Sequence, residues 1–113
     1  MYKEGRAIAR ANGKLAAIRE LLGRDHVCLD IVRYLLGNGE AADTARGIAE
    51  WWINRDVSRT AEALSRLQEL GVVRSHLVQD ATSVYGFTKN PLLRHTLRRC
   101  VDRLSKPTST EVR

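Results

Sequence analysis

The apolar residues of this chain recur at helical spacing over much of its length. They fall three and four residues apart over 3–22 and again over 26–36, with polar residues between them. This periodicity predicts two amphipathic helices, each with one face directed toward a core. The Asn12-Gly13 pair is a turn signal inside the first segment, so either one helix runs through it or a basic arm precedes a shorter helix. We expect one continuous helix, with Asp25 as the cap of the next.

The middle of the chain has the pattern of two short helices joined by a tight turn. Residues 44–73 read TARGIAEWWINRDVSRTAEALSRLQELGVV. Asp43 or Thr44 can cap the first helix, and Asp56 can cap the second, over 57–70. Side chains of these types accept hydrogen bonds from the free backbone N–H groups at helix starts. A glycine follows the second helix, as is common after helix ends.

Two β-prone segments follow, and then a last helix. Residues 72–78 and 83–88 predict the strands of a hairpin, with a short polar loop between them. Asn90 and Pro91 suit the cap and the first position of a helix. Residues 105–113 contain a proline with several Ser and Thr residues, and we expect them to form a disordered tail.

The order of helix, turn, helix, glycine and hairpin resembles the winged helix-turn-helix of transcription regulators. MarR-type and ArsR-type repressors are the nearest in pattern. The resemblance is carried by Ile48-Ala49-Glu50, by Leu64 and Leu67, and by Gly71-Val72-Val73. It implies a mainly α fold with a small β-hairpin, in which a winged helix-turn-helix has extra N- and C-terminal helices.

The resemblance also implies how the chain is organised and what it does. Residues 1–24 would form an N-terminal helix or arm that serves dimerisation, and residues 25–104 the winged helix-turn-helix domain. Helix 57–70 would enter the major groove of double-stranded DNA, with 72–88 as the wing. The implied function is that of a sequence-specific, DNA-binding transcriptional regulator.

The charge of the chain is unevenly distributed. A formal net charge of +6 favours a polyanionic partner such as nucleic acid. Residues 1–24 hold six basic and two acidic side chains, and residues 89–113 hold seven and two, whereas residues 25–88 hold six and nine. The positive charge therefore lies mainly outside the helix-turn-helix. This weakens the argument from net charge alone, although a few arginines on the right face would suffice for DNA contacts.

The second helix of the motif supplies most of the candidate DNA contacts. With Ala61, Leu64 and Leu67 directed to the core, its polar residues face outward. Arginine can donate two hydrogen bonds to guanine, glutamate can accept one from a cytosine amino group, and hydroxyl groups suit phosphates. The alternative for Glu62 and Arg66 is an ion pair with each other at i,i+4 spacing. The expected contacts of this helix and of the turn before it are Arg55, Ser58, Arg59, Thr60, Glu62, Ala63 and Arg66.

The flanking segments are expected to add a few more contacts. Arg46 near the start of the preceding helix is a candidate for a phosphate contact, as are Arg74 and Lys89 at the flanks of the wing. Thr82 is a candidate within the wing. Asp80 places a negative charge at the wing tip, which suits a phosphate poorly.

We interpret the tryptophan and cysteine residues as structural rather than functional. Trp51 and Trp52 are adjacent, so they cannot share a helical face. Trp52 fits a core position, and Trp51 is expected to be partly exposed against the wing, the first helix or a partner. Cys28 and Cys100 fall on apolar helical stripes and are expected to be small buried hydrophobes rather than a redox pair.

Several function classes find no support in the sequence. There is no run of about 18 apolar residues and no apolar signal-peptide core, so we expect a cytoplasmic protein with no membrane contact. The histidines and cysteines lack metal-ligand spacing, and no catalytic motif is present. We therefore expect no metal, no cofactor and no enzymatic activity.

The first and last helices carry more apolar residues than one small core is expected to hide. Pairing these helices across a two-fold axis would place two recognition helices about 34 Å apart, one turn of DNA. We therefore predict a homodimer on a pseudo-palindromic site. A winged-helix adaptor for protein–protein interaction in a larger assembly is the alternative, favoured by the acidic middle segment. The apolar residues concerned are Ile8, Leu15, Ile18, Leu22, Leu97, Val101 and Leu104.

Overall fold

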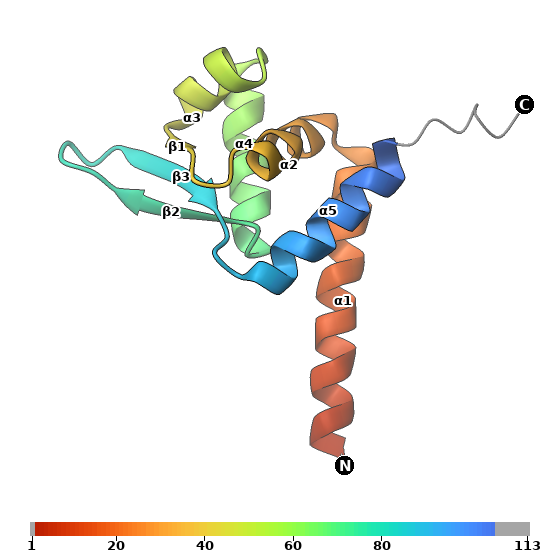
Figure 1. Ribbon diagram of the computed structural model, residues 1–113. Helices are drawn as coiled ribbons and strands as arrows, with labels where there is room; N and C mark the ends of the chain where they lie inside the picture. The colour runs from red at the N-terminus through yellow and green to blue at the C-terminus, as the bar shows by residue number, and fades with distance from the viewer. Residues whose placement is uncertain (1, 106–113) are drawn as a thin grey trace, which may run out of the picture.

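The structure is a computed structural model that describes the backbone of residues 2–105 and the side chains of residues 13–104. It is mainly helical with one small antiparallel sheet, which confirms the predicted fold class (Figure 1). The predicted tail, apart from Ser105, lies outside the described residues. The elements are α1 Tyr2–Arg24, α2 His26–Gly37, β1 Ala42–Asp43, α3 Ala45–Gly47, η1 Ile48–Trp52, α4 Val57–Glu69, β2 Val73–Leu77, β3 Ser83–Phe87 and α5 Pro91–Ser105.

α1 is a single helix that passes through Asn12 and Gly13 without a break, as expected. Its N-terminal half projects beyond the rest of the molecule, and its C-terminal half packs against α2 and α5 (Figure 1). Ile18, Leu21 and Leu22 in the packed half are buried. This half of α1 therefore belongs to the core of its own chain.

Asp25 separates α1 from α2 and caps α2, as predicted. Its carboxylate accepts hydrogen bonds from the backbone N–H groups of Val27 at 3.0 Å and Cys28 at 3.2 Å. Arg66 of α4 donates to the second carboxylate oxygen at 3.2 Å. Burial alone would raise the pKa of the Asp25 carboxyl, but these hydrogen bonds and the charge of Arg66 outweigh it and lower the pKa. One side chain thus joins the start of α2 to α4.

The first helix of the helix-turn-helix changes from α to π geometry along its length. Thr44 caps α3 by accepting a hydrogen bond from the Gly47 N–H at 3.0 Å. In η1, the Ile53 N–H donates to the Ile48 carbonyl at 3.1 Å, a spacing of five residues. The chain then bends at Asn54, whose φ of 53° lies in the left-handed region that asparagine tolerates. The sequence did not predict the π turn.

The two tryptophans of η1 lie in different environments. Trp52 is half-buried, and its ring stacks on Tyr34 of α2 with ring centroids 4.3 Å apart. Trp51 points into solvent, with 81% of its surface exposed. Neither the wing nor α1 covers Trp51, so it is more exposed than the sequence predicted.

α4 begins where the sequence predicts, because the Asp56 carboxylate accepts a hydrogen bond from the Arg59 N–H at 3.0 Å. We predicted Thr60 and Ala63 as outward-facing DNA contacts, and this was wrong, because they are 0% and 1% exposed. The buried hydroxyl of Thr60 keeps a hydrogen-bond partner, because its Oγ1 donates to the Asp56 carbonyl at 2.8 Å. Ala61, predicted to be in the core, is half-buried. The buried residues of α4 are Thr60, Ala63, Leu64 and Leu67.

The sheet has the strand order β1-β3-β2, with a third strand, β1, that the sequence did not predict. Val73 pairs with Phe87, and both are buried, so they mark the face that packs on the helices. Ser75 lies on this same face and accepts a hydrogen bond from Gln68 of α4 at 2.8 Å. Successive residues of a strand point to opposite faces. Arg74 therefore lies on the face directed away from α4.

α5 begins at Pro91 with the side chain of Asn90 as its cap, as predicted. Arg94 then fixes the helix to the rest of the molecule. Its guanidinium donates to the backbone carbonyls of Thr88 at 2.7 Å and Gly39 at 3.1 Å. The start of α5 is thereby joined to the end of the hairpin and to the loop after α2.

A single core joins α1, α2, α4, α5 and the inner face of the sheet. Ile18 and Leu22 of α1 lie in it with Leu97 and Val101 of α5. We predicted that one core could not hide these residues, and for these four the prediction was wrong, because α1 and α5 pack together within the chain. Outside the core, Leu104 is exposed and Leu15 is half-buried, and the side chain of Ile8 lies outside the described residues.

Cys28 and Cys100 are both buried and free. The Cys28 thiol donates to the Ala63 carbonyl at 3.8 Å. Burial, together with the negative charge of Asp25, raises the pKa of Cys28 to about 12, so this residue stays a neutral thiol at physiological pH. Burial also raises the pKa of Cys100.

The adjacent tryptophans provide a matched pair of substitutions. Trp52→Ala removes the stack on Tyr34 and leaves a cavity, so we expect the free energy of unfolding to fall by about 3 kcal/mol. Trp51→Ala should change it by less than about 0.5 kcal/mol, because an exposed side chain loses little packing. Urea unfolding followed by circular dichroism measures both values. Equal losses for the two variants would contradict the environments described above.

Asp25→Ala tests the cap of α2 and its dependence on pH. Because the pKa of Asp25 is lowered in the folded state, its stabilisation is fully present above the unfolded value near 3.8 and is lost as pH falls through the folded value. We expect Asp25→Ala to cost about 1 kcal/mol at neutral pH. The difference from the wild type should shrink below about pH 4.

The matched control is Asp102→Ala, at an exposed aspartate of α5 with no hydrogen bond or ion pair to a described residue. Urea unfolding of this variant at each pH should follow the wild type. A difference between wild type and Asp25→Ala that stayed constant into acid would show that the ionised carboxyl is not what stabilises the cap.

Candidate nucleic-acid interface

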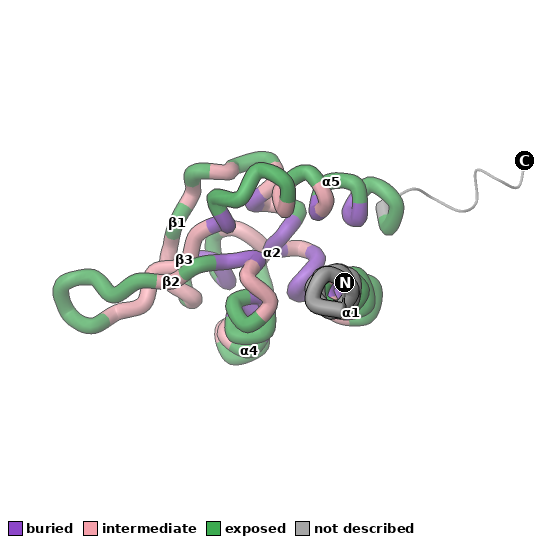
Figure 2. The backbone as a smooth tube through the Cα atoms, turned by 90° about the horizontal axis from the view of Figure 1, so that it is seen from below, coloured by how far each residue is buried: buried purple, intermediate pink, exposed green. Residues whose placement is uncertain are grey.

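α4 forms one side of the molecule, between the hairpin and α1 (Figure 2). The side of α4 turned away from the core exposes Ser58, Arg59, Glu62, Ser65 and Arg66. Four of these were predicted as DNA contacts, and the structure brings them together on one helix face. The major groove of DNA is about 12 Å wide and admits a helix presented in this way.

Arg59 lies in the first turn of α4 and is the most available cation of this face. Its guanidinium makes no hydrogen bond or ion pair with a described residue. The acidic residues Asp56, Glu62 and Glu69 are also exposed along α4, so the charge of this side is mixed. The α4 face therefore offers directed hydrogen-bond donors rather than a uniform positive field.

Arg66 of α4 and Arg55 of the turn before it are held by carboxylates of the α1–α2 region. Arg66 Nη1 lies 3.2 Å from Asp25 Oδ2, and Arg55 Nε lies 2.6 Å from Asp30 Oδ2. The expected alternative of an ion pair between Glu62 and Arg66 is not formed; Arg66 pairs with Asp25 instead. Ion pairs this exposed contribute at most about 1 kcal/mol, so their main effect is to orient the two guanidinium groups.

A hollow of about 350 Å³ lies between the α1–α2 junction and α4. Its charged lining comes from three different parts of the sequence, which only the fold brings together. Sequence reasoning missed its members from the α1–α2 junction, because they lie far from the helix-turn-helix in the sequence. We call it the arginine hollow; its polar lining consists of Arg24, Asp25, His26, Arg55, Arg59 and Arg66.

Arg46 lies outside this hollow, on α3. It forms an ion pair with Glu50, one helical turn later, at 2.9 Å. Its side chain is largely exposed, so it keeps donors for a phosphate. Arg46 stays a candidate contact that the structure places on the first helix of the motif rather than on α4.

The hairpin presents little free positive charge. Arg74 lies on the sheet face directed away from α4, beside a shallow hollow that Lys89 and Glu40 also line. Lys89 is paired with Glu40 at 2.9 Å. The Thr82 hydroxyl donates to Asp80 at 2.8 Å, and this hydrogen bond lowers the pKa of the Asp80 carboxyl, so the wing tip is acidic. The structure therefore does not bring Arg74, Thr82 or Lys89 together with Arg59.

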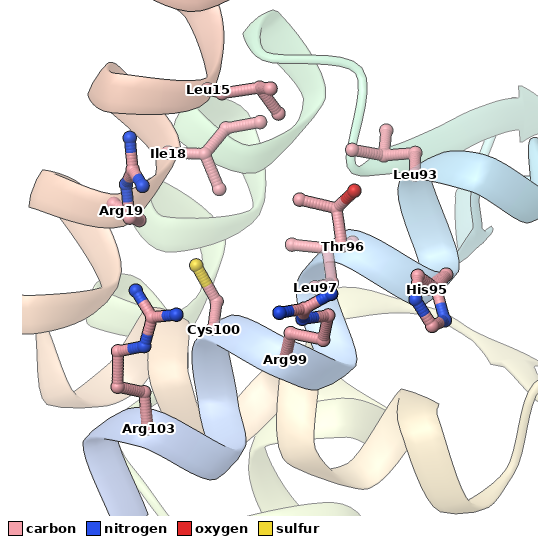
Figure 3. Close-up of a pocket in the computed structure, with 10 residues that line it drawn as sticks. All are labelled: Leu15, Ile18, Arg19, Leu93, His95, Thr96, Leu97, Arg99, Cys100 and Arg103. Carbon is pink, nitrogen blue, oxygen red and sulfur yellow. The ribbon is translucent and has the colours of Figure 1, made fainter.

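A second hollow, of about 260 Å³, lies between α1 and α5 (Figure 3). Ile18, Leu97 and Cys100 line its apolar part. Arg19 of α1 and Arg103 of α5 lie on the side where the Cys100 sulfur is found (Figure 3). The hollow marks where the two helices meet, and its apolar lining continues the core.

Within the part of the chain that the structure describes, no group of three or more His, Cys, Asp or Glu residues could hold a metal ion. None of the helices in residues 2–105 has both the length and the apolar character needed to cross a membrane.

Comparison with known proteins supports the fold. No family model matches the sequence, and no curated protein matches it. The chain is similar to the crystal structure of a transcriptional regulator of the MarR family from Silicibacter pomeroyi, with a TM-score of 0.54 and 18% sequence identity. The similarity covers 98% of this chain and 80% of that one. At this level of identity the similarity concerns the fold, and the chain has the winged helix-turn-helix architecture that its sequence predicts.

Proposed function

We propose that this protein is a sequence-specific, DNA-binding transcriptional regulator that acts as a homodimer, with α4 in the major groove of double-stranded DNA. The observation that carries the proposal is the exposed side of α4, where Arg59 stands in the first turn and pairs with no described residue. The hairpin and the arginine hollow flank this side. The fold, shared with a MarR-family transcriptional regulator, supports it.

In this proposal Arg59 reads a base and its neighbours position the helix. An arginine guanidinium can donate to both O6 and N7 of guanine, and Glu62 can accept from a cytosine amino group. The hydroxyl of Ser58 suits a phosphate oxygen. Arg55 and Arg66 keep free N–H groups beyond those that their aspartate partners use, because a guanidinium has five donors. Bound at a promoter, such a protein blocks or recruits the transcription machinery.

The proposed dimer uses an apolar groove between α1 and α5. Leu15, Leu92 and Leu93 line this groove, and Leu92 is 76% exposed. The groove is formed by the same helix α1 whose N-terminal half projects from the molecule (Figure 1). A second copy that covers the groove with its own α1 and α5 would bury these residues. Two-fold symmetry would then present two α4 helices to one face of DNA.

The second candidate function is a winged-helix adaptor that binds a protein partner. Trp51 favours it, since a tryptophan with 81% of its surface exposed is unusual and aromatic residues are enriched at protein interfaces. The acidic wing tip at Asp80 also favours it, because this charge repels phosphate. The mixed charge of α4 suits either candidate.

The first test is the salt dependence of binding to random genomic DNA fragments, measured by fluorescence anisotropy. The wild-type affinity should fall linearly with salt on logarithmic axes, because phosphate neutralisation releases counterions. Arg59→Ala should weaken binding to the preferred sequence by about 1–3 kcal/mol. Arg59→Lys should keep the salt slope, because the positive charge remains.

The same experiment separates the two candidate functions. A wild-type salt slope near zero would remove the DNA-binding proposal. Capture of one stoichiometric protein partner without nucleic acid would then favour the adaptor, and Trp51→Ala should abolish that capture.

The second test addresses the dimer. Leu92→Arg places a charge in the apolar groove and should weaken self-association by at least about tenfold, or about 1.4 kcal/mol. Leu77→Arg is the matched control, because Leu77 is a leucine of the hairpin, 67% exposed, that does not line the groove. Sedimentation equilibrium measures both variants. A monomeric wild type, or equal weakening by the two substitutions, would contradict the proposed interface.

A further inference from the structure

The arginine hollow carries an excess of positive charge that the α4 face lacks. Its lining contains four arginines and one aspartate, whereas acidic and basic residues alternate along α4 itself. Asp25, the single acidic residue, is already engaged by the start of α2 and by Arg66. Arg24, in the last turn of α1, makes no hydrogen bond or ion pair with a described residue. The hollow therefore has two uncommitted guanidinium groups, those of Arg24 and Arg59.

The arginine hollow and the hairpin lie on opposite sides of α4. Seen along α4, the hairpin lies to one side of the helix and α1 to the other (Figure 2). A duplex that receives α4 in its major groove presents a phosphate backbone on each side of the helix. One backbone would then lie near the hairpin and the other near the α1–α2 junction.

The two sides differ in their capacity to bind a backbone. On the hairpin side, the tip is acidic at Asp80, and Arg74 lies on the face away from α4. On the α1 side, Arg24 and Arg59 line one hollow together with two arginines that aspartates hold in place. Guanidinium groups remain charged at any physiological pH and bind phosphate oxygens in a bidentate manner.

We propose that the arginine hollow binds a phosphate of the DNA backbone, with Arg24 as its ligand, while Arg59 makes the base contact proposed above. The main backbone contact of the protein is then at the α1–α2 junction rather than at the wing. This inference rests on the proposed DNA-binding function.

A phosphate contact at this place has a structural consequence. Arg24 is the last residue of α1, and α1 also lines the groove proposed for the dimer. The contact therefore joins the end of the dimerisation helix directly to DNA. Any change in the angle between the two α1 helices would move Arg24 relative to the phosphate and alter affinity.

The test compares the salt dependence of duplex DNA binding for the full-length wild type and three single variants. Arg24→Ala should lower the slope of log K against log salt by about 0.9 per subunit, or about 1.8 for a dimer, because one phosphate contact is lost in each subunit. Arg74→Ala should lower it by less. Arg99→Ala, at an exposed arginine of α5 outside the arginine hollow, should leave it unchanged.

Circular dichroism and sedimentation check whether each variant keeps the fold and the oligomeric state of the wild type. Arg24→Glu, a second substitution at the same position, should weaken binding at low salt more than Arg24→Ala does. If the wild type binds with a clear salt slope and Arg24→Ala retains that slope, the inference is overturned and the DNA-binding function stands. An equal loss of slope in Arg24→Ala and Arg99→Ala would also overturn it, since net charge alone would explain the result. A wild type without salt-dependent binding removes both proposals.

Discussion

α4 packs against α2 through small side chains, and this contact decides which residues α4 shows to solvent. The Cys28 thiol lies 3.8 Å from the Ala63 carbonyl, and Thr60 is buried on the same side of the helix. Small residues at a helix–helix contact allow the two axes to approach closely, while Leu64 and Leu67 fill the core beneath. With these positions directed inward, Arg59 and its neighbours can only face outward. The candidate interface is therefore a consequence of how the core packs.

Acidic residues of α2 and of the junction before it orient two of the arginines on this surface. Asp25 and Asp30 add to the negative charge of the middle segment. Each also orients one arginine, Arg66 of α4 or Arg55 of the turn before it. Exposed pairs of this kind add little stability, but they reduce the freedom of long side chains that a ligand must otherwise order. Arg24 and Arg59 form no ion pair with a described residue. The distribution of charge across the surface is thus positive near the α1–α2 junction and acidic at the wing tip.

The sequence by itself determined the main helices, the hairpin and their order, though not η1 or β1, because the signals that start and stop a helix are local. Asp25, Asp56 and Asn90 cap α2, α4 and α5 through hydrogen bonds to residues two or three positions away. Gly71 follows α4 with a φ of 78°, a conformation that glycine adopts without strain. With the hydrophobic periodicity, these signals predicted the order of elements that resembles a winged helix-turn-helix. They also placed Ser58, Arg59, Glu62 and Arg66 correctly on the exposed side of α4.

Only the tertiary structure decided the rotation of α4, the partners of its arginines and the extent of the core. Ala61 and Ala63 are equivalent in a hydropathy pattern, and the burial of Thr60 depends on a hydroxyl that bonds to the preceding turn. The apolar residues of α1 pack against α5 of the same chain, and no local pattern in the sequence reveals this contact. Arg24 and Arg59 line one hollow although they lie far apart in the sequence. Such contacts are set by the packing of the whole chain, because the free energy of a core depends on all the surfaces that it brings together.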